Sequence, residues 1–117
     1  MHVYFPPWVY VLLALMTLSV PAAFAGQPNA KAGQLIATTC AVCHGSDGMS
    51  VDTSIPNLAG QHYVYLVQQL NAFKQGSRNS AFMNEQARPL TEEQIEDIAA
   101  YYSSVPIEVG KSRKPKQ

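Results

Sequence analysis

The sequence predicts an all-α domain, because three separate stretches repeat their apolar residues with the period of a helix and none alternates like a strand. These stretches lie within residues 30–40, 63–76 and 91–105. No internal repeat is visible, so a single domain is expected. The first helix runs directly into the two cysteines of the chain, and the chemistry of the protein is therefore expected at its end.

The first 25 residues have the pattern of an export signal. An apolar centre at residues 8–20 is followed by Ala23-Phe24-Ala25, a small-residue sequence typical of a cleavage site. No Lys or Arg precedes the apolar centre, and the uncharged stretch around it is long enough for a membrane span, although three prolines interrupt it. We expect residues 1–25 to be a cleaved signal peptide, with a retained anchor as the alternative.

Residues 26–117 are expected to form one domain with a modest core, which a bulky cofactor would help to fill. The chain has eight acidic and eight basic residues, and half of the basic ones crowd the last seven positions. Residues 111–117 therefore indicate a basic, disordered tail. No basic groove with interleaved aromatic residues is present, so nucleic acid is not expected as a partner.

The first predicted helix covers residues 30–40, with Asn29 as its N-cap. The pattern that predicts it recurs at i, i+3, i+4 and i+7, namely Ala32, Leu35, Ile36 and Thr39. A polar loop with several glycines and prolines follows, as far as Gly60. This loop separates the first helix from the second.

The second predicted helix has the same period and ends near Gly76. Its apolar set is Tyr63, Leu66, Val67, Leu70 and Phe73. The third helix begins with a capping box formed by Thr91 and Gln94, and it should stop before Pro106. Its stripe consists of Ile95, Ile98, Ala99 and Tyr102.

The sequence GSRNSAFMNEQARPL, residues 76–90, has neither a helical nor a strand period. Structureless loops of this length are uncommon in compact domains unless they carry function or are disordered. We therefore expect a functional loop between the second and third helices.

Cys40, Cys43 and His44 allow several kinds of site. A structural zinc site needs about four ligands, usually two separated pairs, and the sequence offers no second pair. A redox CxxC normally follows a strand, and none is predicted here. A disulfide would close a very short loop, which stabilises little, and would leave His44 unexplained.

A covalently bound haem uses all three residues. Each thiol can form a thioether with a haem vinyl group, and an imidazole directly after the second thiol is delivered to one face of the iron. The spacing of Cys40, Cys43 and His44 therefore predicts one haem c attached to this chain.

Five features follow one another along residues 30–105: AGQLIATTCAVCHG, IPNLAGQ, YLVQQLNAFKQGSR, a lone Met in a loop, and LTEEQIEDIAAYY. Their order resembles that in small bacterial class I cytochromes c, and in particular one half of the periplasmic di-haem cytochromes c. Only CxxCH is highly specific by itself. The resemblance implies the class I cytochrome c fold, with three main helices and long loops wrapped around one covalently bound haem.

The resemblance also implies roles for single residues. His44 would be the proximal ligand of the iron, and the carbonyl of Pro56 would accept its ring N–H, unless Pro56 is only a turn residue. Gly33 would let the first helix cross closely against Tyr101 of the last, unless it is merely a tolerated helix glycine.

Four further side chains are implied to contact the haem: Leu58, Tyr65, Leu70 and Arg78. Leu58 and Leu70 would line its apolar faces, a role compatible with membership of the core. Arg78 would pair with a haem propionate, and the alternative is a solvated cation at a helix end. Tyr65 would lie near the haem or else form ordinary surface.

The second axial position has four candidate states: Met83, Met49, His62, or no ligand. Met83 lies in the unexplained loop, and a ligand there would give that loop a function. Met49 belongs to the segment whose Pro56 is already assigned to the proximal side. His62 opens a helix, where a solvated polar residue is common. We predict Met83 as the distal ligand.

Two filled axial positions leave no place for a substrate, which favours electron transfer over catalysis. We expect an exported, periplasmic one-electron carrier with transient redox protein partners and no small-molecule substrate. Membrane contact would occur only through a partner or an uncleaved leader. The alternatives are a haem enzyme or gas-binding sensor with an open sixth site, and a cytochrome subunit of a larger dehydrogenase.

Overall fold

Five α-helices make up the regular structure of the residues that this computed structural model describes, which are 1–2 and 26–108. They are α2 (Ala30–Ile36), α3 (Thr38–His44), α4 (Tyr63–Gln75), α5 (Ala81–Ala87) and α6 (Glu92–Ser104). These described residues contain no strand, and the all-α prediction is confirmed. The predicted basic tail and nearly all of the predicted signal peptide lie outside them. Within the same ranges, no helix has the length and apolar character needed to span a bilayer.

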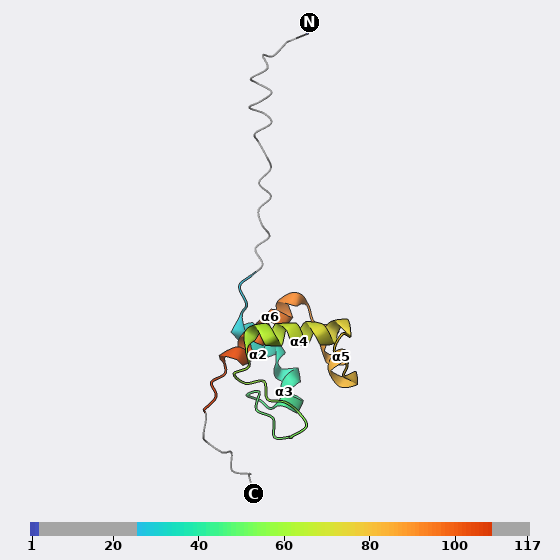
Figure 1. Ribbon diagram of the computed structural model, residues 1–117. Helices are drawn as coiled ribbons and strands as arrows, with labels where there is room; N and C mark the ends of the chain where they lie inside the picture. Colours follow the sequence, from blue (N-terminus) through green and yellow to red (C-terminus); the bar gives the residue numbers. More distant parts are fainter. Residues whose placement is uncertain (3–25, 109–117) are drawn as a thin grey trace.

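The first predicted helix is two helices that meet at Ala37. The Thr38 and Thr39 hydroxyls donate hydrogen bonds to the Leu35 and Ile36 carbonyls, at 2.8 and 3.2 Å. Such bonds from a side chain to the preceding turn often bend a helix. The prediction of one helix over 30–40 was therefore wrong in missing this break, and α3 extends four residues further, to His44. In Figure 1, α3 turns away from α2 toward the long loop that follows it.

The two long helices form as predicted. α4 ends at Gln75, and Gly76 then takes the left-handed conformation with φ of 76°, which glycine adopts without steric cost. α6 begins with the predicted capping box, in which Thr91 and Gln94 each bond the other's backbone N–H. α6 ends at Ser104, before Pro106.

The segment 76–90 is not a plain loop, because it contains α5. The side chain of Ser80 caps this helix by accepting the backbone N–H of Met83, at 3.2 Å. Only seven residues are helical, too few for a periodic apolar pattern to be visible in the sequence. α5 packs against α4, and Figure 1 shows it beside the C-terminal end of that helix.

The core forms where α2 and α4 pack against α6. The buried residues of this cluster are Ala37, Leu66, Ile98, Ala99 and Tyr102. Gly33 permits α2 to approach α6 closely, since a Cβ built on this glycine would lie 1.9 Å from the backbone oxygen of Asp97. The nearest neighbours of Gly33 are thus backbone atoms of Asp97 and Ile98 in α6, and a direct contact with Tyr101, one turn later, stays a prediction. A hydrogen bond of 2.6 Å from the Asn29 N–H to Asp97 Oδ1 fastens the start of α2 to the same place.

Candidate functional site

The three chemistry-bearing residues predicted from the sequence all lie on α3. Cys40 and Cys43 are free thiols, each half-buried. Residues three apart on a helix share a face, so both sulfurs can reach the same flat group. Val42, between them, is 86 % exposed, which places the other side of this helical turn at the surface.

The ring of His44 is held in a defined orientation. Its side chain is buried, and Nδ1 lies 2.8 Å from the carbonyl oxygen of Pro56. A carbonyl oxygen can only accept, so Nδ1 must carry the proton and donate. The lone pair of the neutral ring is then on Nε2, the atom that is available for a metal ion. The contact that the resemblance implies between His44 and Pro56 is therefore present.

Backbone hydrogen bonds hold the loop that carries Pro56. The carbonyl of Gly48 accepts the N–H groups of Leu58 and Ala59, at 2.7 and 3.0 Å. Gly48 has φ of 76°, and a Cβ there would lie 2.7 Å from the ring of Tyr102. Since only glycine fits this position, the loop can fold back against α6 and bring Pro56 to His44.

The sulfur of Cys40 faces the core, where it packs against the buried cluster. Burial is the main cause that raises the pKa of its thiol, while the neighbouring side chains of Thr39 and Tyr102 act in the opposite direction. Burial likewise raises the pKa of Tyr102. The helical period predicted Tyr102 as a core residue, but nothing in the sequence indicated that Cys40 would pack against the cluster that contains it.

The resemblance implies four side chains as haem contacts, and the two leucines lie in different surroundings from the two polar residues. Leu58 and Leu70 are partly buried and pack against the core cluster, whereas Tyr65 is 44 % exposed. Arg78 is exposed, and its guanidinium lies 4.5 Å from the centre of the Phe73 ring. Its Nη1 atom also contacts Gln69 Oε1 at 2.5 Å. Arg78 is thus held against α4, and its role toward a propionate remains a prediction.

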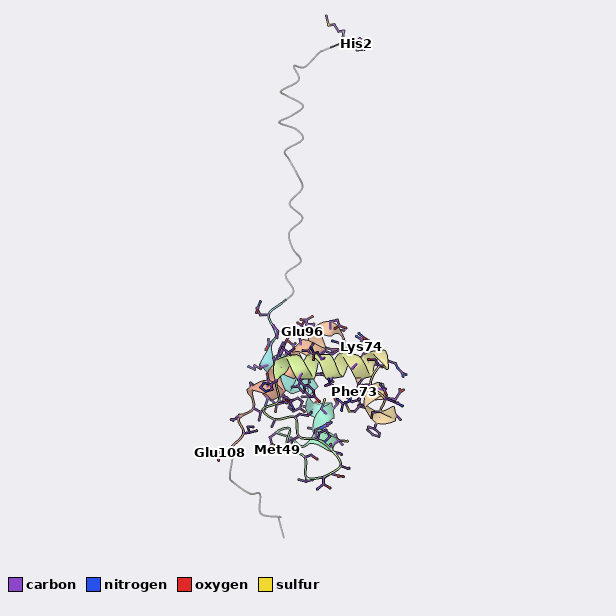
Figure 2. The ribbon with its side chains drawn as sticks, in the orientation of Figure 1. His2, Met49, Phe73, Lys74, Glu96 and Glu108 are labelled. Carbon is purple, nitrogen blue, oxygen red and sulfur yellow. The ribbon has the colours of Figure 1, made fainter. Side chains whose placement is uncertain are left out.

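The three candidates for the second axial position occupy different parts of the fold. Met83 is half-buried in α5, the helix that packs against α4 beside its C-terminal end (Figure 1). Met49 lies in the loop after α3, where its backbone oxygen would be 2.3 Å from a Cβ on Gly45. Figure 2 shows Met49 on this loop, well apart from α5. His62 is exposed at the N-cap of α4.

The donor set fits a covalently held haem. Two thiols lie on one face of α3, an imidazole with an available Nε2 follows them, and apolar side chains of the core adjoin Cys40. Among the described residues, no three His, Cys, Asp or Glu side chains are grouped as they would be to hold a bare metal ion. This combination defines a haem protein of the thioether-linked kind.

The chain belongs to the cytochrome c family, whose model matches residues 30–106. Membership confirms the predicted resemblance and fold and implies covalently bound haem c. The match includes every helix described above.

Individual proteins support this assignment. The chain is 44 % identical over 79 residues to cytochrome c-554(548) of Halomonas halodenitrificans, covering 65 % of this chain and 95 % of that protein. It is 38 % identical over 96 residues to cytochrome c4 of Pseudomonas aeruginosa, covering 82 % of this chain and 48 % of that one. The structure of Acidithiobacillus ferrooxidans cytochrome c4 matches with a TM-score of 0.63 and 40 % identity, over 68 % of this chain and 53 % of that chain. The chain therefore spans about half the length of these cytochromes c4.

Proposed function

We propose that this chain is a monohaem cytochrome c that carries single electrons between redox proteins, with His44 and Met83 as its axial ligands. The observation that carries the proposal is the buried imidazole of His44. This residue directly follows Cys43, and its ring is hydrogen-bonded to the carbonyl of Pro56. When bound, haem c supplies an iron that changes its charge by one electron. The protein residues decide how that iron is held and how far water is kept away.

On the proximal side, the proposed roles follow from the geometry. Cys40 and Cys43 attach the haem through their sulfurs, and His44 presents Nε2 to the iron. The hydrogen bond to Pro56 keeps the ring from turning and makes Nε2 a better donor. Leu58 and Leu70 are proposed to exclude water, because their side chains pack against the apolar cluster.

On the distal side, the thioether of Met83 is the proposed ligand. Thioether sulfur is a soft donor that favours the reduced iron, and His/Met ligation therefore raises the reduction potential. With both axial positions filled, no site remains for a substrate. This supports the function of a carrier over that of an enzyme.

Electron exchange is proposed at the surface beside the cysteines, where Val42 is 86 % exposed. Weak redox encounters bury less than about 1,200 Å², so a small patch here is sufficient. A relative from Stutzerimonas stutzeri carries the name thiosulfate dehydrogenase electron acceptor, which supports a redox enzyme as the donor class. The predicted signal peptide, residues 1–25, supports a periplasmic location.

A second candidate function is that of a cytochrome subunit held permanently in a dehydrogenase. It is favoured by the 38 % identity, over 73 residues, to the cytochrome subunit of sulfide dehydrogenase of Chlorobaculum tepidum. Purification from the native host distinguishes the two functions. A carrier purifies alone, whereas a subunit is retained with its dehydrogenase. The open-site enzyme or sensor would instead bind cyanide or carbon monoxide rapidly at neutral pH.

The attachment of haem to Cys40 and Cys43 can be tested by mass spectrometry and extraction. The exported protein is expected to show the mass of residues 26–117 plus one haem, and acidified organic solvent should leave the haem in place. Cys40→Ala and Cys43→Ala should each retain one thioether, while the double variant should release its haem into the solvent. Extraction of haem from the wild-type protein would contradict the attachment.

A further inference from the structure

The side chain of Asn84 makes three hydrogen bonds, one to α4, one to the turn after it and one to the N-cap of α5. Its Nδ2 donates to the carbonyl of Phe73 at 2.6 Å and to the carbonyl of Arg78 at 2.9 Å. Its Oδ1 accepts the N–H of Ser80 at 2.8 Å. One side chain thus links the end of α4, the connecting turn and the start of α5. We call these three bonds the Asn84 clamp.

α5 depends on such contacts for its position. An isolated helix of two turns is not stable in water, because nucleation costs more than so few hydrogen bonds return. Ala87 is its only fully buried residue, and Phe82 is 69 % exposed. Apolar burial therefore anchors α5 only at its end. Figure 2 shows Phe73, the residue whose carbonyl the clamp holds, at the end of α4 beside α5.

Met83 directly precedes Asn84 and is held by the same arrangement. Its backbone N–H donates to the Ser80 hydroxyl at 3.2 Å, while the N–H of Ser80 donates to Asn84. Successive helical residues point about 100° apart, so Asn84 can grip α4 while Met83 presents a different face of α5. Fixing Asn84 therefore fixes the backbone from which the Met83 sulfur extends.

We propose that Asn84 is the positioning residue that keeps Met83 on the iron, through its clamp between the end of α4 and the start of α5. This inference rests on the proposed role of Met83. Without the clamp, α5 moves away from α4 more often, and in that state the sixth position accepts water or an added ligand. Sequence patterns did not single out Asn84, because its bond to the Phe73 carbonyl in α4 depends on how the two helices pack.

Two substitutions remove the clamp in different ways. Asn84→Asp keeps the shape and the acceptor for Ser80, but sets an oxygen against the carbonyls of Phe73 and Arg78. Asn84→Ala deletes the clamp while raising the intrinsic helix propensity of α5. If Asn84 served only to stabilise the helix, Asn84→Ala would leave Met83 bound as firmly as before. The clamp predicts that both variants open the site.

The experiment titrates the oxidised holoprotein with imidazole and follows the sulfur-to-iron charge-transfer band. Loss of two or three net-favourable hydrogen bonds should raise the apparent affinity for imidazole by about tenfold or more in both variants. The band should weaken and the reduction potential should fall. Asn79→Asp is the matched control, because Asn79 is exposed in the same connection and the substitution adds the same charge. Its imidazole affinity should stay within about twofold of the wild type.

Met83→Ala separates failure of this inference from failure of the proposed function. If Met83→Ala loses the band while both Asn84 variants keep it and bind imidazole like Asn79→Asp, the clamp is not what positions Met83. If Met83→Ala itself keeps the wild-type band, the ligand assignment is wrong and the inference falls with it. A weakened band in Asn84→Ala, with its helical circular dichroism unchanged, supports the clamp.

Discussion

Met83→Ala is expected to keep its haem but to lose the character of an electron carrier. The thioethers at Cys40 and Cys43 do not involve Met83, so attachment should be unaffected. Removal of a ligand that favours reduced iron should lower the reduction potential and admit water or an external ligand. Visible spectroscopy of the oxidised protein should show the sulfur-to-iron charge-transfer band in the wild type and not in this variant.

Met49→Ala is the matched control for this experiment. It removes the same side chain from the loop after α3, on the segment that already contacts the proximal side, and it should retain the band. A Met83→Ala protein with the band and potential of the wild type would overturn both the ligand assignment and the inference to a closed site. His44→Ala should be more damaging than either, because it removes the residue that orients the haem plane.

Gly33→Ala is expected to cause the largest loss of folding stability. A Cβ at this position would lie 1.9 Å from the backbone oxygen of Asp97 and 2.9 Å from the backbone nitrogen of Ile98. Neither atom can move without displacing α6, so α2 must shift instead. We expect a loss of about 3 kcal/mol or more in the free energy of unfolding, at the upper end for overpacked cores. Guanidinium denaturation followed by circular dichroism measures it.

Gly76→Ala provides the comparison, because Gly76 has space for a side chain but a left-handed backbone conformation. Nothing lies within 4 Å of a Cβ at Gly76, and its φ of 76° is the sole obstacle. The expected cost is about 1 kcal/mol, the penalty for an L-residue in the left-handed region. If Gly33→Ala unfolds at the same denaturant concentration as Gly76→Ala, the close crossing of α2 and α6 is not the main constraint at Gly33.

The long helices could be predicted because their signals are local. The stripe from Ile95 to Tyr102 and the capping box at Thr91 lie within one segment, and α6 forms where they predict it. Gly76 likewise ends α4 through its own backbone conformation. α5 escaped prediction, because seven residues cannot display a period and Ser80 alone is a weak signal. The bend at Ala37 depends on two Thr hydroxyls whose choice of acceptor the sequence does not reveal.

The chemistry of the site could be predicted from local spacing alone. Cys40, Cys43 and His44 lie within five residues of one helix, so their spacing alone predicts thioether attachment and an imidazole beside it. Family membership then agrees with the cofactor predicted from those residues. A local motif of this kind needs no knowledge of the rest of the fold.

The support of these residues depends on contacts between separate elements of the fold, which the sequence does not reveal. Asp97 holds the start of α2 across 68 positions of sequence, and Asn84 reaches the Phe73 carbonyl across 11. Gly33 lies against the backbone carbonyl of Asp97 in α6. Such pairings depend on how the helices cross, and crossing is set by the packing of the whole core. Helical period and capping patterns report which face of a helix is buried, but they do not report which atom of another helix it meets.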